Sequence, residues 1–390
     1  MNYKPILAAL LLISGSLAYA ADVPIVIDRK YDPSGFMEPI PVNISGFTPE
    51  AANILRWDLT FMAFTNVPAG QAKFLIKGSN GSRVEGRLIE QFNQHEIFAR
   101  AYTGASERSQ IHALADDIAR TLIKGVPTIA QSKIAFKVEI GRGNSEVYIS
   151  DYDGFNPIQV TRDNTIVSAP CWAGHGSLFY STYKLGNPRI FSQNLGTGTR
   201  KPITPYNGAN ISPAVSPDGS KLAMILSKSG SPNLYVSDLN GGNLKQLTFS
   251  HDGESCPCWS PDNQTICFVS RERGPASLFT ISAHGGRPRL LSTAGAPTPT
   301  EPDWSPDGKW IAFTSQQREF KLYIIPSAGG SIIDLQTAGE DAVWAPNSRA
   351  VIFSKGPDHA KTLSLLDVPT KQVKTIARIL ESNSQPSWAK

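Results

Sequence analysis

Charged residues are scarce and nearly balanced in this chain of 390 residues. Asp, Glu, Lys and Arg make up 18% of it, and the formal net charge is only +4. The sequence has no run of five or more basic residues, so no nucleic-acid partner is expected. Hydrophobic residues reach 41%, which is enough to bury a core and argues against a globally disordered chain. The length itself predicts two or three domains.

Long apolar runs are also missing, except at the N-terminus. There Lys4 is followed by the apolar residues 6–13 and then by the small residues Ala18 and Ala20. This order predicts a secretory signal peptide over residues 1–20. A membrane anchor is the alternative, but the run is shorter than the ~20 apolar residues that a spanning helix needs. We therefore expect an exported chain that is not membrane-spanning after cleavage.

Cysteine is rare, and its spacing excludes common sites. The four residues are Cys171, Cys256, Cys258 and Cys267. The i,i+2 spacing of Cys256 and Cys258 does not fit a C-x-x-C redox or zinc pair. In the oxidising compartment that export implies, one disulfide to Cys267 is an open interpretation. Buried thiols that pack as small hydrophobic groups are at least as well supported.

Signatures of catalysis are absent as well. The sequence contains no G-x-S-x-G, no H-E-x-x-H and no Walker-type phosphate loop. The histidines are scattered singly, which favours structural or solvated roles. We expect no enzyme activity, no catalytic residue, no metal and no cofactor. The alternatives are a propeller-type hydrolase or lyase acting on glycan or peptide, and a carbohydrate-binding periplasmic protein.

What the chain does contain is a repeat that extends over residues 131–390. Its core is P-x-W-S-P-D-G, followed by an apolar strand, a loop, a second strand that ends in Leu-Tyr or Leu-Phe, and a Gly-rich turn. A period of ~40–45 residues with four short strands per copy is typical of β-propeller blades. The Trp position of the successive copies is occupied by Trp172, Val215, Trp259, Trp304, Trp344 and Trp388.

The last copy is incomplete, and the first repeat-like residues supply the missing part. Only one strand surrounds Trp388, whereas residues 132–138, 146–150 and 157–161 resemble the second, third and fourth strands of a blade. Pairing of these segments would close the ring and remove its open edges. We predict a six-bladed all-β propeller over residues 131–390 that is closed by the C-terminal strand.

Within this ring, the motif aspartates are predicted to form turns. Asp151, Asp153 and Asn156 have a spacing that hints at calcium, but other copies have ordinary Gly-containing turns in the same place. The Ser-Pro-Asp segments are read in the same way, because Asp bonds to its own backbone in such turns. Neither pattern predicts a metal site.

Residues 21–130 do not repeat. Thr48, followed by Pro and Glu, predicts the start of one helix, and Ser106 predicts the start of another. Three strand-like segments lie between them, at 73–77, 84–90 and 95–102. This order predicts an α/β N-terminal domain over residues 33–130, preceded by a strand-like arm over residues 21–32.

Together these features resemble the TolB family, the periplasmic translocation proteins of the Tol–Pal cell-envelope system. Ser-Pro-Asp-Gly turns occur in many propellers, but their combination with this N-terminal part is specific. The most telling stretches are residues 23–28, 132–136, 212–224 and 233–239. The resemblance implies a non-enzymatic adaptor in the periplasm. That adaptor would support outer-membrane integrity and constriction of the outer membrane at cell division.

The resemblance further implies two partner-binding regions, with other envelope proteins as additional candidate partners. The peptidoglycan-associated lipoprotein, Pal, would bind loops that precede the innermost strands at one mouth of the propeller. The matching rim positions are Asn210, Ile211, Ser212, Glu254, Ser255, Cys256, Thr300, Glu301, Glu340, Asp341 and Gln385. TolA would bind the N-terminal arm through Asp22, Val23, Ile25, Val26, Ile27 and Asp28. The β-branched arm residues could instead form an edge strand of their own domain, and both interpretations stay open.

Overall fold

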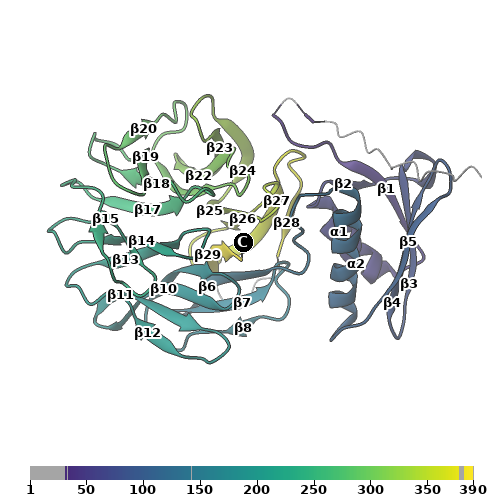
Figure 1. The fold of residues 1–390 in the computed structure, drawn as a ribbon, viewed down its shortest axis with the longest axis horizontal. Helices are drawn as coiled ribbons and strands as arrows, with labels where there is room; N and C mark the ends of the chain where they lie inside the picture. The colour runs from purple at the N-terminus through teal and green to yellow at the C-terminus, as the bar shows by residue number, and fades with distance from the viewer. Residues whose placement is uncertain (1–30, 33, 142, 377–381, 390) are drawn as a thin grey trace, which may run out of the picture.

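The computed structural model describes residues 31–32, 34–141, 143–376 and 382–389. Figure 1 shows an N-terminal part, drawn in purple and blue, beside a ring of β-sheets. The predicted signal peptide and arm residues 22–28 lie outside the described residues. In the part that the structure describes, no helix is long and apolar enough to cross a bilayer.

The N-terminal part is a five-stranded sheet with two helices, which confirms the predicted α/β class, although the sequence predicts only three of the five strands. The sheet order is β2-β1-β3-β4-β5. Its strands are β1 (Ile40–Ser45), β2 (Phe64–Asn66), β3 (Phe74–Asn80), β4 (Val84–Glu90) and β5 (Glu96–Tyr102). The helices are α1 (Pro49–Thr60) and α2 (Glu107–Leu122), and a one-turn 3-10 helix spans Ala69–Gln71. Figure 1 shows α1 and α2 between this sheet and the ring.

The two helices begin where their capping residues predict. The Thr48 side chain accepts a hydrogen bond from the Ala51 N–H, and Pro49 occupies the first turn. Ser106 forms a capping box with Ser109 at the start of α2. Their apolar faces enter a core that also contains residues of the ring, including Tyr152 and Trp388. The core is therefore continuous between the two parts.

The ring contains six four-stranded sheets, which we number as blades in chain order. Blade 1 is β9 (Val167–Ala173), β10 (Ser177–Leu185), β11 (Asn187–Asn194) and β12 (Arg200–Pro202). Blade 2 is β13 (Asn210–Val215), β14 (Lys221–Leu226), β15 (Asn233–Asp238) and β16 (Lys245–Gln246). Blade 3 is β17 (Glu254–Trp259), β18 (Thr265–Ser270), β19 (Ser277–Ser282) and β20 (Arg289–Leu291). Blade 4 is β21 (Pro299–Trp304), β22 (Trp310–Gln316), β23 (Phe320–Pro326) and β24 (Ile333–Ala338).

The last two blades include the closure of the ring. Blade 5 is β25 (Glu340–Trp344), β26 (Ala350–Lys355), β27 (Thr362–Asp367) and β28 (Val373–Thr375). Blade 6 is β29 (Ser382–Trp388), β6 (Lys133–Gly141), β7 (Asn144–Asp151) and β8 (Ile158–Gln159). Trp388 reinforces this join, because its Nε1–H donates to the Ser132 hydroxyl at 2.7 Å and its ring stacks on Tyr152. The predicted six-bladed propeller with a shared blade is confirmed.

Strand direction defines two faces of the propeller. In each blade the end of the second strand pairs with the start of the innermost strand, as Leu226 does with Asn210. We call the face where the innermost strands start the rim face. The N-terminal part contacts turns on the other face: Asn347 donates to the Phe61 carbonyl at 2.8 Å, and Arg349 donates to the Met37 carbonyl at 2.6 Å. The N-terminal part therefore packs against the face of the propeller opposite the rim face.

Candidate functional site at the propeller rim

Each innermost strand is interrupted near its start by one residue with a left-handed backbone. The φ angles at this position lie between 49° and 56°, and in each blade the register with the second strand shifts around it. The six residues are Ala169, Ser212, Cys256, Glu301, Asp341 and Gln385. Positive φ is uncommon for residues other than glycine, so its repetition marks a β-bulge that is built into every blade.

The bulges correct one prediction about the rim. The eleven rim residues were expected in loops ahead of the innermost strands, but they lie within β13, β17, β21, β25 and β29. Strand pairing resumes on the rim side of each bulge, so each strand begins earlier than the P-x-W motif suggests. The proline of the motif directly follows the left-handed residue in five of the six blades. Proline has no N–H to donate, which suits the unpaired position of a bulge.

A chain of hydrogen bonds links the bulges of neighbouring blades. The Asp341 N–H donates to the Glu301 carboxylate at 2.8 Å, and the Gln385 N–H donates to the Asp341 carboxylate at 2.9 Å. The Ala169 N–H then donates to the Gln385 side-chain oxygen at 2.9 Å. Each of these side chains thus satisfies a backbone group of the next blade, which holds the rim in one geometry.

Blade 1 shows what sequence reasoning missed. No residue of this blade was placed at the rim, yet Ala169 occupies the same bulge position as the five others. The signal was available, because Ala169 precedes Pro170 and Trp172 with the spacing of the other copies. Alanine has no side-chain acceptor, so the chain of hydrogen bonds that starts at Glu301 ends there.

Two rim side chains, the buried Glu254 and the half-buried Glu301, have carboxyl groups with no cation beside them among the described residues. Burial, followed by the nearby charge of Asp341, raises the pKa of Glu301 to about 8. Burial also raises the pKa of Glu254 to about 7, and its Oε2 has no hydrogen-bond partner among the described residues. Within that part of the chain, neither carboxyl group forms an ion pair with a basic side chain. Burial raises the pKa of Glu340 as well, although the ammonium of Lys361 opposes the shift.

The other predicted rim residues differ in exposure and in role. Asn210 is fully buried, and its side-chain amide donates to three carbonyls, of Pro188, Tyr206 and Gly208. It therefore fixes a loop rather than facing a partner. The half-buried members are Ile211, Ser212, Ser255, Cys256, Thr300, Glu301, Glu340, Asp341 and Gln385.

The four cysteines are thiols in the structure; two of them are buried, and Cys171 and Cys256 are half-buried. Cys258 and Cys267 are buried directly opposite one another on β17 and β18. Cys256 sits at the bulge of blade 3, where burial and then the charge of Glu301 raise the pKa of its thiol. A raised pKa keeps that thiol protonated at neutral pH.

A second cluster of charged groups lies where the N-terminal part meets blade 6. His112 of α2 has its Nδ1 2.7 Å from the Asp58 carboxylate and its Nε2 3.4 Å from the Asp153 carboxylate. Arg108 donates from Nε to the same Asp153 carboxylate at 2.8 Å, and the Tyr152 hydroxyl donates to Asp58. This interface cluster explains why Asp153 is not a calcium ligand candidate: its oxygens face two basic side chains.

The two basic groups and the two carboxylates of the interface cluster stabilise each other's charge. Burial opposes the charged imidazolium, but Asp58 and Asp153 outweigh it and raise the pKa of His112 to about 10. Burial likewise disfavours the Asp153 carboxylate, yet His112 and Arg108 lower its pKa. Across the described ranges, no group of three or more His, Cys, Asp or Glu residues could hold a metal ion.

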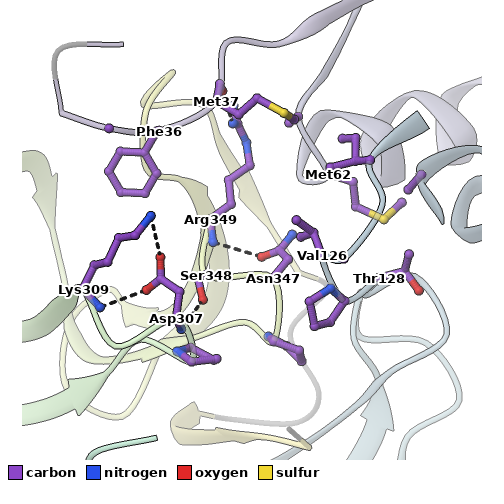
Figure 2. Close-up of a pocket in the computed structure, with 18 of the residues that line it drawn as sticks. Phe36, Met37, Met62, Val126, Thr128, Asp307, Lys309, Asn347, Ser348 and Arg349 are labelled. Carbon is purple, nitrogen blue, oxygen red and sulfur yellow. Dashed lines mark hydrogen bonds and ion pairs between the residues drawn. The ribbon is translucent and has the colours of Figure 1, made fainter. Parts of the chain in front are cut away.

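A cavity of about 370 Å³ lies between the two parts of the molecule. Figure 2 shows Phe36 and Met37 on one side of it and Asn347, Ser348 and Arg349 on another. The Arg349 guanidinium joins Met37 to the propeller, because it also pairs with the Asp367 carboxylate at 2.6 Å. Tyr31, which belongs to the predicted arm over residues 21–32, lines the cavity.

Comparison with known proteins agrees with this architecture. A family model described as the TolB beta propeller domain matches residues 121–390. A Tol-Pal system protein TolB from Desulfosudis oleivorans is 32% identical over 164 residues, which are 40% of this chain and 37% of that protein. The protein of that name from Pasteurella multocida is 30% identical over 221 residues, or 53% of this chain and 50% of that protein. The chain thus spans about half the length, or less, of the curated relatives that it matches.

A solved structure extends the likeness to the N-terminal part. The crystal structure of TolB from Acinetobacter baumannii aligns with a TM-score of 0.76 over 93% of this chain and 98% of that one. Its sequence identity of 20% supports the fold alone. The family model, however, covers more than half of the chain, including all six blades. On that ground the chain belongs to the TolB β-propeller family.

Proposed function

We propose that this chain is a periplasmic adaptor of the Tol–Pal system, which supports outer-membrane integrity and constriction at cell division. In this proposal the rim face binds Pal and the arm over residues 21–32 binds TolA. The family membership and the Tol-Pal names of the curated relatives support it. The observation that carries it is the ring of six bulges, which repeats one backbone geometry in all six blades around one mouth of the propeller. A rigid docking face loses little conformational entropy on binding.

The chemistry of the rim suits recognition of a partner's hydrogen-bond donors. The carboxyl groups of the half-buried Glu301 and the buried Glu254 lack a basic partner among the described residues, which is unfavourable in the unbound protein. A donor or a cationic side chain from a bound protein would supply the missing partner. Binding would then give these two carboxyl groups the hydrogen-bond donor or cation that they lack in the unbound protein.

The arm supports the second half of the proposal through its composition. Val23, Ile25, Val26 and Ile27 favour extended structure, and such a segment can add a strand to the sheet edge of a partner. Because Tyr31 lines the cavity between the two parts of the molecule, the arm joins the fold beside that cavity. An arm that is either docked or released would give the adaptor two states.

Titration calorimetry with the mature chain tests both halves separately. Deletion of residues 22–30 should abolish binding to TolA and leave binding to Pal intact. Reversal of the rim charge by Glu301→Lys and Glu340→Lys should weaken binding to Pal and leave TolA binding intact. Unchanged TolA binding after the deletion contradicts the role of the arm, and unchanged Pal binding contradicts the role of the rim.

The adaptor proposal also assigns the chain no catalysis. Incubation of the mature chain with a panel of cell-wall glycans and peptides should give no product above a buffer control. Turnover that Glu301→Gln removes would favour the hydrolase alternative instead.

A further inference from the structure

Three of the four cysteines lie together in blade 3. Cys258 and Cys267 belong to a hydrophobic cluster that residues of blades 3 and 4 form, and Cys256 packs against this cluster. Cys171 lies elsewhere, in blade 1, where its register partner is Phe179. The adaptor function assigns no part to Cys258 or Cys267, so we asked what chemistry their arrangement permits.

Cys258 of β17 and Cys267 of β18 are directly opposite one another. The Ser260 N–H donates to the Thr265 carbonyl at 2.8 Å, which makes that opposite pair a hydrogen-bonded one. Hydrogen-bonded and non-hydrogen-bonded pairs alternate along an antiparallel ladder, so Cys258 and Cys267 occupy a hydrogen-bonded pair as well. The Cα atoms of such a pair are about 5.5 Å apart, within the range of about 4.4–6.8 Å that a disulfide spans. Both side chains enter the same cluster, so a disulfide can join them in the existing register.

The same register position holds compact pairs in three of the other five blades. In blades 2, 4 and 6 the pairs are Ala214 with Ala223, Asp303 with Ala312, and Ser387 with Ala135. Among the described strands, only blade 3 places two cysteines opposite each other. The fold thus accepts a compact pair at this position, and the alanine pair of blade 2 shows which substitution the position tolerates.

Cys256 is not an equivalent partner for Cys267. The bulge places Cys256 between the paired positions of Ser255 with Val269 and of Cys258 with Cys267, so Cys256 has no register partner of its own. Burial and the charge of Glu301 also raise the pKa of its thiol, which lowers the fraction of thiolate, the form that attacks a disulfide. The register therefore distinguishes between two cysteines that the sequence spacing leaves equivalent.

We propose that Cys258 and Cys267 form a disulfide when the chain folds in contact with a disulfide oxidant, either an oxidised small thiol or an oxidised dithiol protein. The thiolate of one cysteine attacks the oxidant, forms a mixed disulfide and releases one thiol. The thiolate of the other cysteine then attacks the mixed disulfide, forms the bond between Cys258 and Cys267 and releases the second thiol. The two cysteines lose two electrons and two protons, and the oxidant is reduced to two thiols. This inference goes beyond the adaptor function and does not rest on it.

Burial determines when this bond forms and how long it persists. Cys258 is 7% exposed and Cys267 is 0% exposed, so the folded chain shields both from oxidant and reductant. The bond therefore forms during folding, before blade 3 packs on blade 4, and is protected afterwards. It ties the innermost strand β17, which carries Glu254 and Ser255 of the rim, to β18. A cross-link restricts the unfolded chain and thereby stabilises the folded one.

Refolding of the mature chain from urea tests the proposal. One sample refolds with a mixture of oxidised and reduced glutathione, and the other with reduced glutathione alone. After oxidative refolding, we expect two of the four thiols to be lost to a thiol reagent in denaturant. The melting temperature should be higher than that of the reduced sample by about 3–6 °C. Chymotryptic cleavage after Trp259 separates Cys258 from Cys267, so mass spectrometry should find the two peptides linked.

Two double variants make the assignment specific. Cys258→Ala with Cys267→Ala reproduces the alanine pair of blade 2, so it should keep its two thiols and show no shift in melting temperature on oxidation. The matched control, Cys171→Ala with Cys256→Ala, leaves the proposed pair as the only cysteines. It should lose both thiols and show the same shift as the unmodified chain.

The outcomes that would overturn the proposal are distinct. Four titratable thiols after oxidative refolding would show that the pair stays reduced. A link that involves Cys256, or a glutathione adduct on one cysteine in place of the link, would assign the chemistry differently. If the alanine-pair variant does not fold, the control variant still decides, because it keeps Cys258 and Cys267. None of these outcomes bears on the adaptor function, since no binding partner takes part in the experiment.

Discussion

The rim and the interface cluster both bury carboxyl groups, but they treat the charge differently. At the interface, Asp153 faces Arg108 and His112, and its pKa is lowered. At the rim, Glu301 faces Asp341, and its pKa is raised to about 8. Residues of one chemical type are thus held charged on one face of the propeller and pushed toward the neutral form on the other.

The difference lies in the charged partners: the carboxylates at the interface have basic partners within the chain, whereas the rim carboxyl groups of Glu301 and Glu254 have none among the described residues. A buried charge with its partners in place is stabilised, whereas a buried charge without them is costly. The interface cluster resembles the inside of a folded domain, which fits its position between two parts that share one core. The rim keeps an unfavourable arrangement that a bound partner could relieve.

Removal of the His112 side chain should reduce stability more than any other substitution predicted below. His112→Ala would leave the carboxylates of Asp58 and Asp153 buried with less positive charge beside them. We expect a loss of about 3 kcal/mol in the free energy of unfolding, measured by urea denaturation at pH 7. His359→Ala is the control, because His359 pairs with Glu139 but its side chain is 86% exposed. Equal effects of the two substitutions would show that the interface cluster contributes nothing special.

Alkaline pH should weaken the same cluster without any mutation. The pKa of His112 is raised to about 10 in the folded chain, above the value of about 6.5 expected in the unfolded chain. Its contribution is therefore fully present below pH ~6.5 and is lost as the pH rises toward 10. The stability difference between the unmodified chain and His112→Gln should shrink steadily over that range in urea titrations. A constant difference would mean that the imidazole is not charged in the folded state.

The rim should respond to pH in a different manner. Because the pKa of Glu301 is raised to about 8, its neutral form favours folding below pH ~4.5, and this advantage is lost as the pH approaches 8. Glu301→Gln keeps a neutral acceptor for the Asp341 N–H and should stabilise the chain at pH 8 by about 2 kcal/mol. Glu319→Gln, at a side chain that is 63% exposed, should have no such effect. Stabilisation that does not depend on pH would contradict this account.

Local and periodic features could be predicted from the sequence, whereas features of docking could not. Thr48 and Ser106 cap helices through neighbouring residues, and the Trp period follows from six copies of one packing unit. The interface cluster joins Asp58, His112 and Asp153, which meet only when the two parts pack together. No local pattern contains that information.

The bulges are intermediate between the features that the sequence predicts and those that it does not. Their left-handed positions are occupied by six different residue types, so composition does not reveal the backbone conformation. Proline follows five of them, but a proline is equally compatible with the first residue of a strand. The position of each bulge is revealed only by the register between the innermost strand and the second strand of its blade.

The smallest expected effect concerns the hydrogen bonds that link the bulges. Gln385→Ala removes the acceptor of the Ala169 N–H, which is otherwise bonded at 2.9 Å across the join between blades 6 and 1. We expect a loss of about 1 kcal/mol in the free energy of unfolding, since a single backbone donor is left without its partner. Gln71→Ala, at an exposed position of the N-terminal part, should cost less than about 0.5 kcal/mol. Because the bond joins the first blade to the last, hydrogen exchange of the Ala169 amide should also accelerate. An unchanged exchange rate would show that the bulges hold their geometry without the side chains that connect them.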